Sequence, residues 1–484
     1  MKKHYFILGL AFTLLASACS KNSDDDTEVI VVPPTNGSTV EVSGDIKTNT
    51  TWSASKIYQL KGYVYVTDGA TLTIEPGTII KGDKATKATL VITRGAKISA
   101  IGTADKPIVF TSGVAAGARR EGDWGGIILL GKGIDNRGVN NTIEGGLSPT
   151  AGGDAAKYIQ FGGTDAADNS GTLKYVRVEY AGIPFSVDSE INGVTFGAVG
   201  SGTTVEYVEV YRSGDDAFEW FGGSVNAKHL LSIGTWDDDF DTDNGFSGKI
   251  QFALAQRYPL VADQSGSNGF ESDNDANGSD NSPETGAIFS NVSIVGPLKA
   301  STTTINGFFQ HAAQIRRNSS ISTFNSIFTG FPDGIYIDDT KVTTPGSTTA
   351  NYTAGRLSFE NNLVYGIKNA DIKGTSLSLI EATLRATNSF VPATYGAALI
   401  TDGFKYPADI ASTASGNIGR PNFAYLAASP AATGAVFTNA KVADAFFEKV
   451  AYKGAFGTDD WTAKWASFDP QVLAYTTPGA VNAN

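Results

Sequence analysis

Oxygen-bearing side chains with a regular spacing occur in the segment DNDANGSDNSPE, residues 273–284. Three of them alternate along the chain, a glycine then allows a sharp bend, and a carboxylate closes the segment at its last position. This spacing is the pattern of a calcium-binding loop. The predicted metal ligands are Asp273, Asp275, Asn277, Ser279 (through its carbonyl) and Glu284. The alternative is a solvated turn, which Asn and Asp favour by themselves.

Further carboxylates gather upstream, in segments that end in similar Asp-rich or Asn-rich turns. If these segments form adjacent parallel strands, equivalent positions lie about 4.8 Å apart and their carboxylates repel one another. A hard cation with oxygen ligands would relieve that repulsion, and calcium fits best. The second candidate group of calcium ligands is therefore Asp239, Asp241 and Asp243, flanked by Asp215, Asp216, Asp237, Asp238 and Glu271.

An enzymatic role is the main alternative to simple binding. Asp215 and Asp216 are adjacent carboxylates, and paired carboxylates serve as acid and base in glycoside hydrolysis. A lyase needs a base beside a cation, for which Arg212 and Lys228 are candidates, although either residue would serve equally in an ordinary ion pair. No phosphate loop, zinc spacing or serine nucleophile motif is present. Catalytic residues thus stay unassigned, and the sequence favours a non-catalytic protein.

Two tryptophans lie within these acidic segments, Trp220 and Trp236. Aromatic rings stack on the apolar faces of sugars, so both are candidate contacts for a glycan. The alternative is an internal aromatic ladder.

Internal repetition indicates how these residues are positioned. The segment that begins at Leu72 realigns with the one that begins at Leu90, at an offset of 18 residues, and a second motif of a polar residue, a small residue and an apolar residue recurs from Asp216 to Ile335. Repeats with a fixed turn and variable spacing indicate a solenoid. We predict a right-handed parallel β-helix over 45–370, with Leu72 stacked on Leu90. The segment SLSLIEATLRA has helical spacing, so 371–484 is expected to form the last coils and a mixed cap.

Several segments also resemble those of a family of secreted or lipid-anchored β-helix proteins, common in Bacteroidetes, with the architecture of pectate lyases. They are GATLTIEPGTIIKG, RGAKISAIGTADKPIVFTS, GDWGGIILLG, SGTLKYVRVEYAG and SGDDAFEWFGG. This resemblance implies an all-β fold and an extracellular location. It implies no particular reaction.

The N-terminus predicts processing and a lipid anchor. Lys2 and Lys3 precede the apolar stretch 7–15, which is shorter than the roughly 20 residues of a membrane-spanning helix. Small residues then lead to Cys19, the single cysteine of the chain, in a sequence that resembles a bacterial lipobox. We expect a signal peptide over 1–18 and acylation of Cys19.

An acidic, flexible tether is expected over 19–44, because this segment has an Asp triplet and no periodic apolar face. The triplet resembles a signal for display on the outer face of the outer membrane. The formal net charge of −12 argues against nucleic acid as a partner. Together these features predict a surface-exposed lipoprotein, stiffened by calcium, that binds an extracellular ligand such as a glycan or serves as a scaffold, beside an outer-membrane importer. A purely structural spacer or adhesin is a further alternative.

Overall fold

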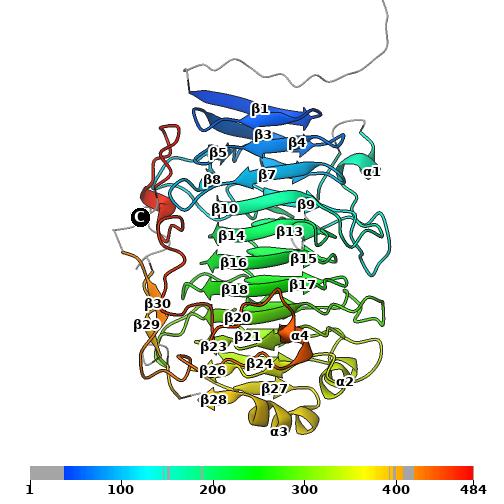
Figure 1. Cartoon of the computed structure of the whole chain (residues 1–484), viewed down its shortest axis with the longest axis vertical. Coiled ribbons are helices and arrows are strands. Elements are labelled where there is room, and N and C mark those ends of the chain that lie inside the picture. The colour runs from blue at the N-terminus through cyan, green and yellow to red at the C-terminus, as the bar shows by residue number, and fades with distance from the viewer. Residues whose placement is uncertain are drawn as a thin grey trace, which may run out of the picture.

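A computed structural model describes residues 38–144, 146–149, 153–186, 189–391, 393–395, 399–406 and 419–482. Cys19, the expected signal peptide and most of the expected tether lie outside the described residues. The chain winds into a solenoid in which 26 strands form one continuous parallel sheet (Figure 1). The expected all-β parallel β-helix is therefore confirmed.

Each coil contributes strands to three faces. Face one contains β2 (Thr50–Trp52), β4 (Thr71–Ile74), β7 (Lys97–Ile101), β10 (Gly171–Glu179), β14 (Thr204–Tyr211), β16 (Asn226–Ile233), β18 (Lys249–Gln256), β20 (Ile288–Val295), β22 (Ser322–Phe324) and β25 (Phe359–Glu360). Face two contains β1 (Thr39–Ile46), β3 (Ile57–Val66), β5 (Ile79–Gly82), β8 (Ile108–Ser112), β23 (Ile327–Thr329), β26 (Leu363–Tyr365) and β28 (Ser389–Val391), together with the second halves of β10 to β20.

Face three positions the candidate site. After the second halves of β1 and β3 it contains β6 (Thr89–Ile92), β9 (Gly126–Leu130), β13 (Val194–Gly197), β15 (Phe218–Phe221), β17 (Phe240–Asp243), β19 (Phe270–Ser272), β21 (His311–Ile315), β24 (Asp333–Ile337) and β27 (Ile372–Gly374). Two antiparallel pairs stand apart from the solenoid, β11 (Pro184–Ser186) with β12 (Ser189–Glu190), and β29 (Ile400–Asp402) with β30 (Asn422–Tyr425).

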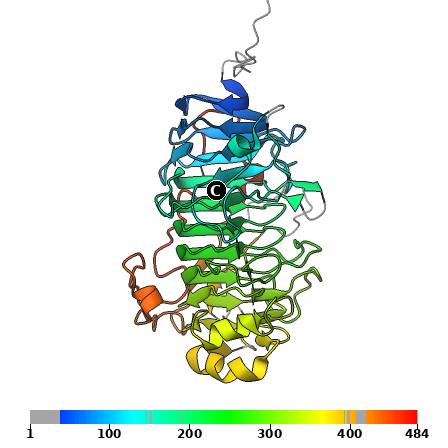
Figure 2. The same ribbon diagram turned by 90° about the vertical axis from the view of Figure 1, so that its right-hand side faces the viewer.

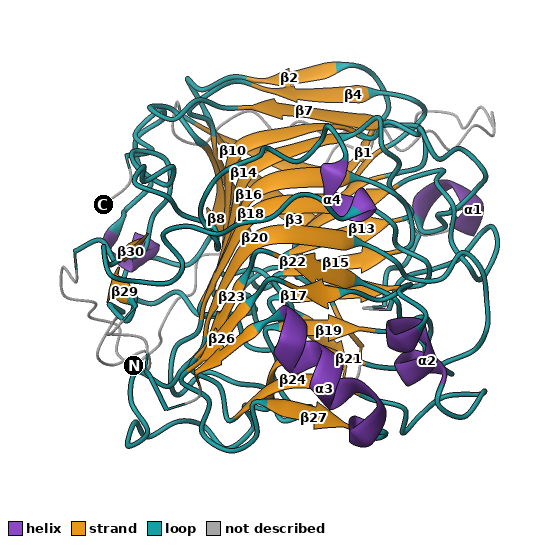
Figure 3. Ribbon diagram, turned by 60° about the horizontal axis from the view of Figure 1, so that its bottom comes forward, coloured by secondary structure: helices purple, strands orange, loops and turns teal. Residues whose placement is uncertain are grey.

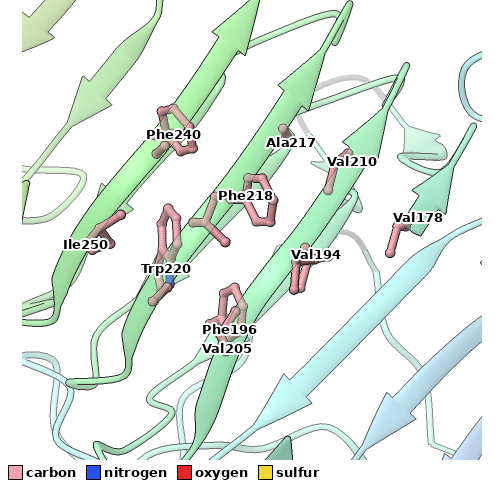
Figure 4. Close-up of a cluster of buried hydrophobic side chains, with 14 of the residues drawn as sticks. Val178, Val194, Phe196, Val205, Val210, Ala217, Phe218, Trp220, Phe240 and Ile250 are labelled. Carbon is pink, nitrogen blue, oxygen red and sulfur yellow. The ribbon is translucent and has the colours of Figure 1, made fainter. Parts of the chain in front are cut away.

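Interior side chains of successive coils stack in rows. Phe218 lies over Phe240 with ring centroids 5.9 Å apart, and Trp220 lies over Phe196 at 5.5 Å (Figure 4). Because alternate residues of a strand point to opposite faces, the residue between Phe218 and Trp220 must point outward. This alternation places Glu219 on the outer surface of face three.

The expected register of the first coils is wrong. Leu72 pairs with Ile98 on face one, whereas Leu90 pairs with Val64 and Ile127 on face three. The strand, glycine turn and strand that recur at 18 residues occupy different corners of the solenoid, β4 to β5 and β6 to β7, so the offset is a fraction of a coil. The turn glycines Gly77 and Gly95 share a positive φ, of 86° and 85°, which explains the similar local sequence.

A corner between faces one and two is formed by residues with positive φ. Tyr175, Tyr207, His229 and Phe252 stack outward there, with neighbouring centroids 4.4, 4.2 and 5.2 Å apart. Asn291, Asn325 and Asn361 continue the same row. Asparagine tolerates this conformation better than most residues, and the aromatic rings gain stacking energy there.

Helices close the C-terminal end of the stack. The predicted helix is present as α3 (Leu377–Thr387), beside α2 (Ser347–Thr353), and both lie at the last coils (Figures 2 and 3). The short α1 (Ala155–Tyr158) and α4 (Ala440–Ala443) lie on the flanks. The segment 430–482, here called the C-terminal strap, runs back along the outside of the solenoid. It includes a 3-10 turn at Pro470–Val472.

Candidate cation-binding cleft

The turns that lead into face three are tied together by side chains. Asp216 accepts a hydrogen bond from the backbone N–H of Asp238, Asp238 accepts one from Asn268, and Asn268 accepts one from His311. Each of these side chains is buried. The Asp-rich turns are thus part of the structure of the solenoid, and they hold carboxylates of successive coils in one line.

A second row of acids stands on the strands themselves. Glu219 of β15 pairs with Asp241 of β17, and Asp241 pairs with Glu271 of β19. Carboxylate oxygens of this row and of the turns come within 4.8 Å of one another in three groups: Asp215, Asp216 and Asp237; Asp216, Glu219 and Asp241; and Asp238, Asp241 and Glu271. Since the second and third groups share Asp241, they form one continuous cluster. Oxygen ligands at such distances are what a hard cation requires.

The cluster lines a cleft of about 1010 Å³ on face three. Carboxylates dominate its described wall, which carries only two guanidinium groups. The acids are Glu144, Glu190, Asp215, Asp216, Glu219, Asp237, Asp238, Asp241, Asp243, Asp263, Glu271 and Asp273, and the bases are Arg316 and Arg317. Such an excess of like charge destabilises the fold unless protons or cations neutralise it.

Burial and mutual repulsion raise the pKa of these acids. Burial, followed by the charge of Asp243, raises the pKa of Asp241 to about 8, and burial raises that of Asp237 to about 6. The pKa values of Asp216 and Asp238 also lie well above the usual range, first because of burial and then because of neighbouring carboxylates. Buried Oδ1 atoms of Asp237 and Asp241 have no hydrogen-bond donor in the described part of the chain. The cleft therefore favours a bound proton or cation.

Arginines close one end of the acidic row. Arg316 contacts Glu271 and donates to Asp273 over 2.8 Å, while Arg317 donates to Asp273 over 2.7 Å. These ion pairs neutralise Glu271 and Asp273 in part. The charge that remains unbalanced lies around Asp216, Glu219 and Asp241.

The structure does not bring the predicted loop ligands of 273–284 together. Asp273 pairs with the two arginines, Asp275 accepts from the backbone and hydroxyl of Ser279, and Glu284 pairs with Arg356 at 3.3 Å. Asn277 donates its backbone N–H to Asp275, whose carboxylate therefore organises the turn. Calcium in this loop remains a prediction, for which the geometry of the described residues offers no support.

The other predicted ligands divide between cleft and core. Asp241 and Asp243 line the cleft, whereas Asp239 is buried against Arg257 at 3.3 Å and Ser232 at 2.5 Å, and is absent from the cleft wall. Since Asp239 is already neutralised by Arg257, it is unsuited to the metal role predicted for it.

The catalytic candidates divide in the same way. Asp215 and Asp216 lie in the cleft, but the basic candidates do not. Arg212 forms a buried ion pair with Glu121, and Lys228 pairs with Glu448 of the C-terminal strap at 2.8 Å. Both bases therefore form ordinary ion pairs, which was the alternative to a catalytic role for them.

The two tryptophans have opposite positions. Trp220 is fully buried in the interior stack, with Phe246 on its other side at 5.3 Å, so the expectation that it contacts a glycan is wrong. Trp236 is 40% exposed and lines the cleft, as does Phe308, which is 49% exposed. Strand alternation could have identified Trp220 as an interior residue, because it lies two positions after the interior Phe218 and so points to the same side of the strand.

Several cleft residues carried no sequence signal of their own. Glu219 is revealed only by its register with Asp241, whereas Glu144 reaches the cleft from a loop and Glu190 from β12. Phe308 belongs to a motif that repeats the Asn-Gly-Phe at 268–270, yet it stands in a loop while Phe270 lies in the core. Repeats in sequence and equivalent positions in the solenoid therefore do not coincide everywhere.

Comparison with known proteins agrees with the fold. No curated protein and no solved structure matches the chain significantly. A family model described as a pectate-lyase-like β-helix domain matches residues 44–401. Because that match covers well over half of the 484 residues, the chain belongs to the family of pectate-lyase-like β-helix domain proteins.

Proposed function

We propose that this protein is a non-catalytic binding protein whose face-three cleft holds a divalent cation, with calcium as the best fit, and takes an extracellular glycan. The observation that carries the proposal is the cluster of carboxylates joined through Asp241, whose oxygens lie within 4.8 Å of one another in each group. Carboxylate oxygens of three consecutive coils meet there, so a cation would link the coils as well as neutralise them.

The glycan part of the proposal is supported by the rim of the cleft. Trp236 and Phe308 present exposed aromatic rings beside carboxylates, and sugars offer apolar faces to rings and hydroxyls to carboxylates. Hydrogen bonds from Ser267 join the two segments. Its backbone N–H donates to the carbonyl of Phe308, and its hydroxyl donates to the carbonyl of Trp236. The backbone segments that carry the two rings are thus held next to each other.

Calcium titration of two matched variants tests the cation site. Asp241→Asn removes the one carboxylate that belongs to both the second and the third group, and we expect calcium affinity to fall about tenfold or more. Asp275→Asn makes the same change in the predicted loop and should leave affinity unchanged. Calorimetry on metal-stripped protein measures both. If only Asp275→Asn loses calcium binding, the cation site lies in the loop 273–284 and not in the cleft. Absence of calcium binding by the parent protein would refute the proposal.

Trp236→Ala separates glycan binding from stability. It should abolish retention on an oligosaccharide array with little change in melting temperature, because the ring is exposed. Val139→Ala shortens another exposed apolar side chain and serves as the control. Equal retention of the two variants on every glycan bound by the parent would exclude Trp236 from the site.

A carbohydrate-active lyase or hydrolase is the second candidate. The observation that favours it is that Asp216 and Asp241 bring carboxylate oxygens within 4.8 Å of each other in the cleft, where burial and neighbouring carboxylates raise the pKa of both, because a protonated carboxyl beside a carboxylate suits glycoside cleavage. Release of reducing ends or unsaturated products from a polysaccharide panel, lost in Asp241→Asn, would establish this activity. Absence of products across the panel favours the binding protein.

We also infer attachment to the outer membrane through acylated Cys19, with the solenoid facing the exterior and an importer as its partner. The inference rests on the N-terminal sequence. Among the described residues, no helix has the length and apolarity to cross a bilayer. Mass spectrometry of the membrane fraction should find lipid on Cys19, and Cys19→Ala should release the protein. A Cys19→Ala variant that stays membrane-bound would contradict this location.

A further inference from the structure

A second hollow, of about 730 Å³, adjoins the acidic cleft. The loop 301–310 separates the two, since Phe308 lines the cleft whereas its neighbours Gly307 and Phe309 line the hollow. Hydroxyl and amide groups dominate the wall, which includes Thr302, Thr304, Asn306, Gln310 and Asn369. These are the groups that bind hydroxyl-rich ligands.

The hollow differs from the cleft in charge. Its charged residues are Lys368, Lys373 and Asp333. Lys373 is 3.1 Å from Asp333, whereas Lys368 has no acidic side chain within ion-pair distance in the described parts of the chain. One positive charge therefore remains in the hollow, beside a cleft lined with carboxylates and in a chain with a formal net charge of −12.

A buried histidine orients Lys373. His311 is only 4% exposed, and its Nδ1 is 3.0 Å from the Oδ1 of Asn268. Because the amide nitrogen of Asn268 donates to Glu271, its oxygen is the acceptor and Nδ1 of His311 carries the proton. Nε2 of His311 therefore accepts from Lys373, which lies 3.0 Å away.

This network leaves Lys373 with unused hydrogen-bonding capacity. An ammonium group has three N–H donors, and His311 and Asp333 take two of them. Burial, followed by the charge of Lys373, lowers the pKa of His311 to about 4, so the imidazole is neutral and adds no charge of its own at pH 7. Lys373 thus offers one remaining donor, and Lys368 offers a full ammonium group.

We propose that this hollow is a second ligand site, which binds a saccharide carrying an anionic group, either a sulfate ester or a carboxylate. The two lysines contact the anion, and the hydroxyl and amide wall contacts the sugar. Lysine ammonium groups act as point charges that accept an oxyanion from several directions. The site needs no cation, so it goes beyond the function proposed for the cleft.

Calorimetry with three single sugars tests this site. Galactose 6-sulfate, glucuronate and galactose are titrated into the full-length protein with a chelator present, which keeps cations out of the cleft. We expect at least one anionic sugar to bind, galactose not to bind, and the affinity to fall with added salt. Absence of binding by both anionic sugars, or equal affinity for galactose and its sulfate, would overturn the proposal.

Variants locate the bound sugar. Lys368→Met should weaken binding about tenfold, the loss expected for one charge-assisted hydrogen bond. Lys97→Met removes a similarly exposed charge far from the hollow, on β7, and should have no effect. Lys373→Met should also weaken binding, with a melting curve recorded to show that the variant is folded. Equal affinities of Lys368→Met and Lys97→Met for the anionic sugar would overturn the site. Asp241→Asn should leave the affinity for this sugar unchanged, so the test of the hollow does not depend on the test of the cation site.

Discussion

Asp241 belongs to two of the three carboxylate groups, so its protonation is coupled to the state of the whole cleft. Its pKa of about 8 lies far above that of an unfolded aspartate, and Glu209, buried elsewhere beneath the C-terminal strap, also has a pKa of about 8. In both cases burial is the main cause. Between pH 7 and 8 the folded protein therefore binds more protons than the unfolded chain.

Stability without cations should consequently fall as pH rises from 7 to 8. A carboxyl group with a raised pKa contributes most at low pH and loses its contribution as pH passes the folded value. The two histidines among the described residues do not obscure this window, because His229 and His311 have pKa values of about 3 and 4 and stay neutral in the folded state. Thermal melting in a chelator measures the effect, about 1 kcal/mol per group and pH unit.

Calcium should reverse this trend, because the cation replaces the protons and binds better as they leave. At a concentration 100 times its dissociation constant it would stabilise the protein by about 2.7 kcal/mol. Asp241→Asn serves as the control, with a weaker pH dependence and little response to calcium. A melting temperature that rises with pH in the chelated protein would contradict the proposed protonation of the cleft.

Residue types alone could predict an acidic site but not its members. Asp273 matches the first position of a calcium loop, yet Arg316 and Arg317, more than 40 positions away, occupy its oxygens. Those arginines directly follow β21, which is two strands along the face from the strand of Asp241, and their position depends on the long loop between β20 and β21. Glu219 shows the reverse case, because its place in the site follows from parity and strand pairing once the coil is known.

At the scale of elements, the C-terminal strap completes the outer wall of the solenoid. Arg177, Glu179 and Glu209 point outward from β10 and β14, and the strap buries them. Arg177 donates to the hydroxyl of Tyr475, and Glu209 accepts from the backbone of Ser467. Without the strap these charges would face solvent, so the strap and the solenoid surface depend on each other.

Asn325 holds the strap by a pair of hydrogen bonds to one residue, Val436. Its amide accepts from the backbone N–H of Val436 at 2.8 Å and donates to the carbonyl of the same residue at 3.0 Å. Asn325→Asp removes the donor and buries a charge, and we expect a loss of about 1–3 kcal/mol. Hydrogen exchange should increase around Val436, while Asn422→Asp, an exposed change, should alter neither exchange nor stability. Unchanged exchange at Val436 would show that the strap is held elsewhere.

The elements were predictable to different degrees. Alternating apolar residues and glycine turns predicted a solenoid, and the helical spacing of SLSLIEATLRA predicted α3. The register was not predictable from the 18-residue offset, because the same strand and turn serve two corners, β4 to β5 and β6 to β7. The path of the strap was not predictable either, since Trp465 packs edge-on against Tyr175 and Tyr207, which lie 290 and 258 residues earlier in the sequence.

At the scale of the molecule, the solenoid transmits stability mainly between neighbouring coils. The carboxylate cluster joins residues that precede or belong to β15, β17 and β19, which are consecutive along face three. A cation there would fasten these coils directly. Coils at the N-terminal end, such as those of β3 and β6, are separated from the cluster by β9 and β13.

Hydrogen exchange with and without calcium should therefore reveal a local effect. We expect slower exchange in β15, β17 and β19 when calcium is bound, and unchanged exchange in β3 and β6, because local opening of the middle coils must release the ion whereas fraying of the N-terminal coils need not. Asp241→Asn should remove the difference. Equal protection of all coils would mean that the solenoid opens only as a whole, and protection confined to 273–284 would place the cation in the loop instead of the cleft.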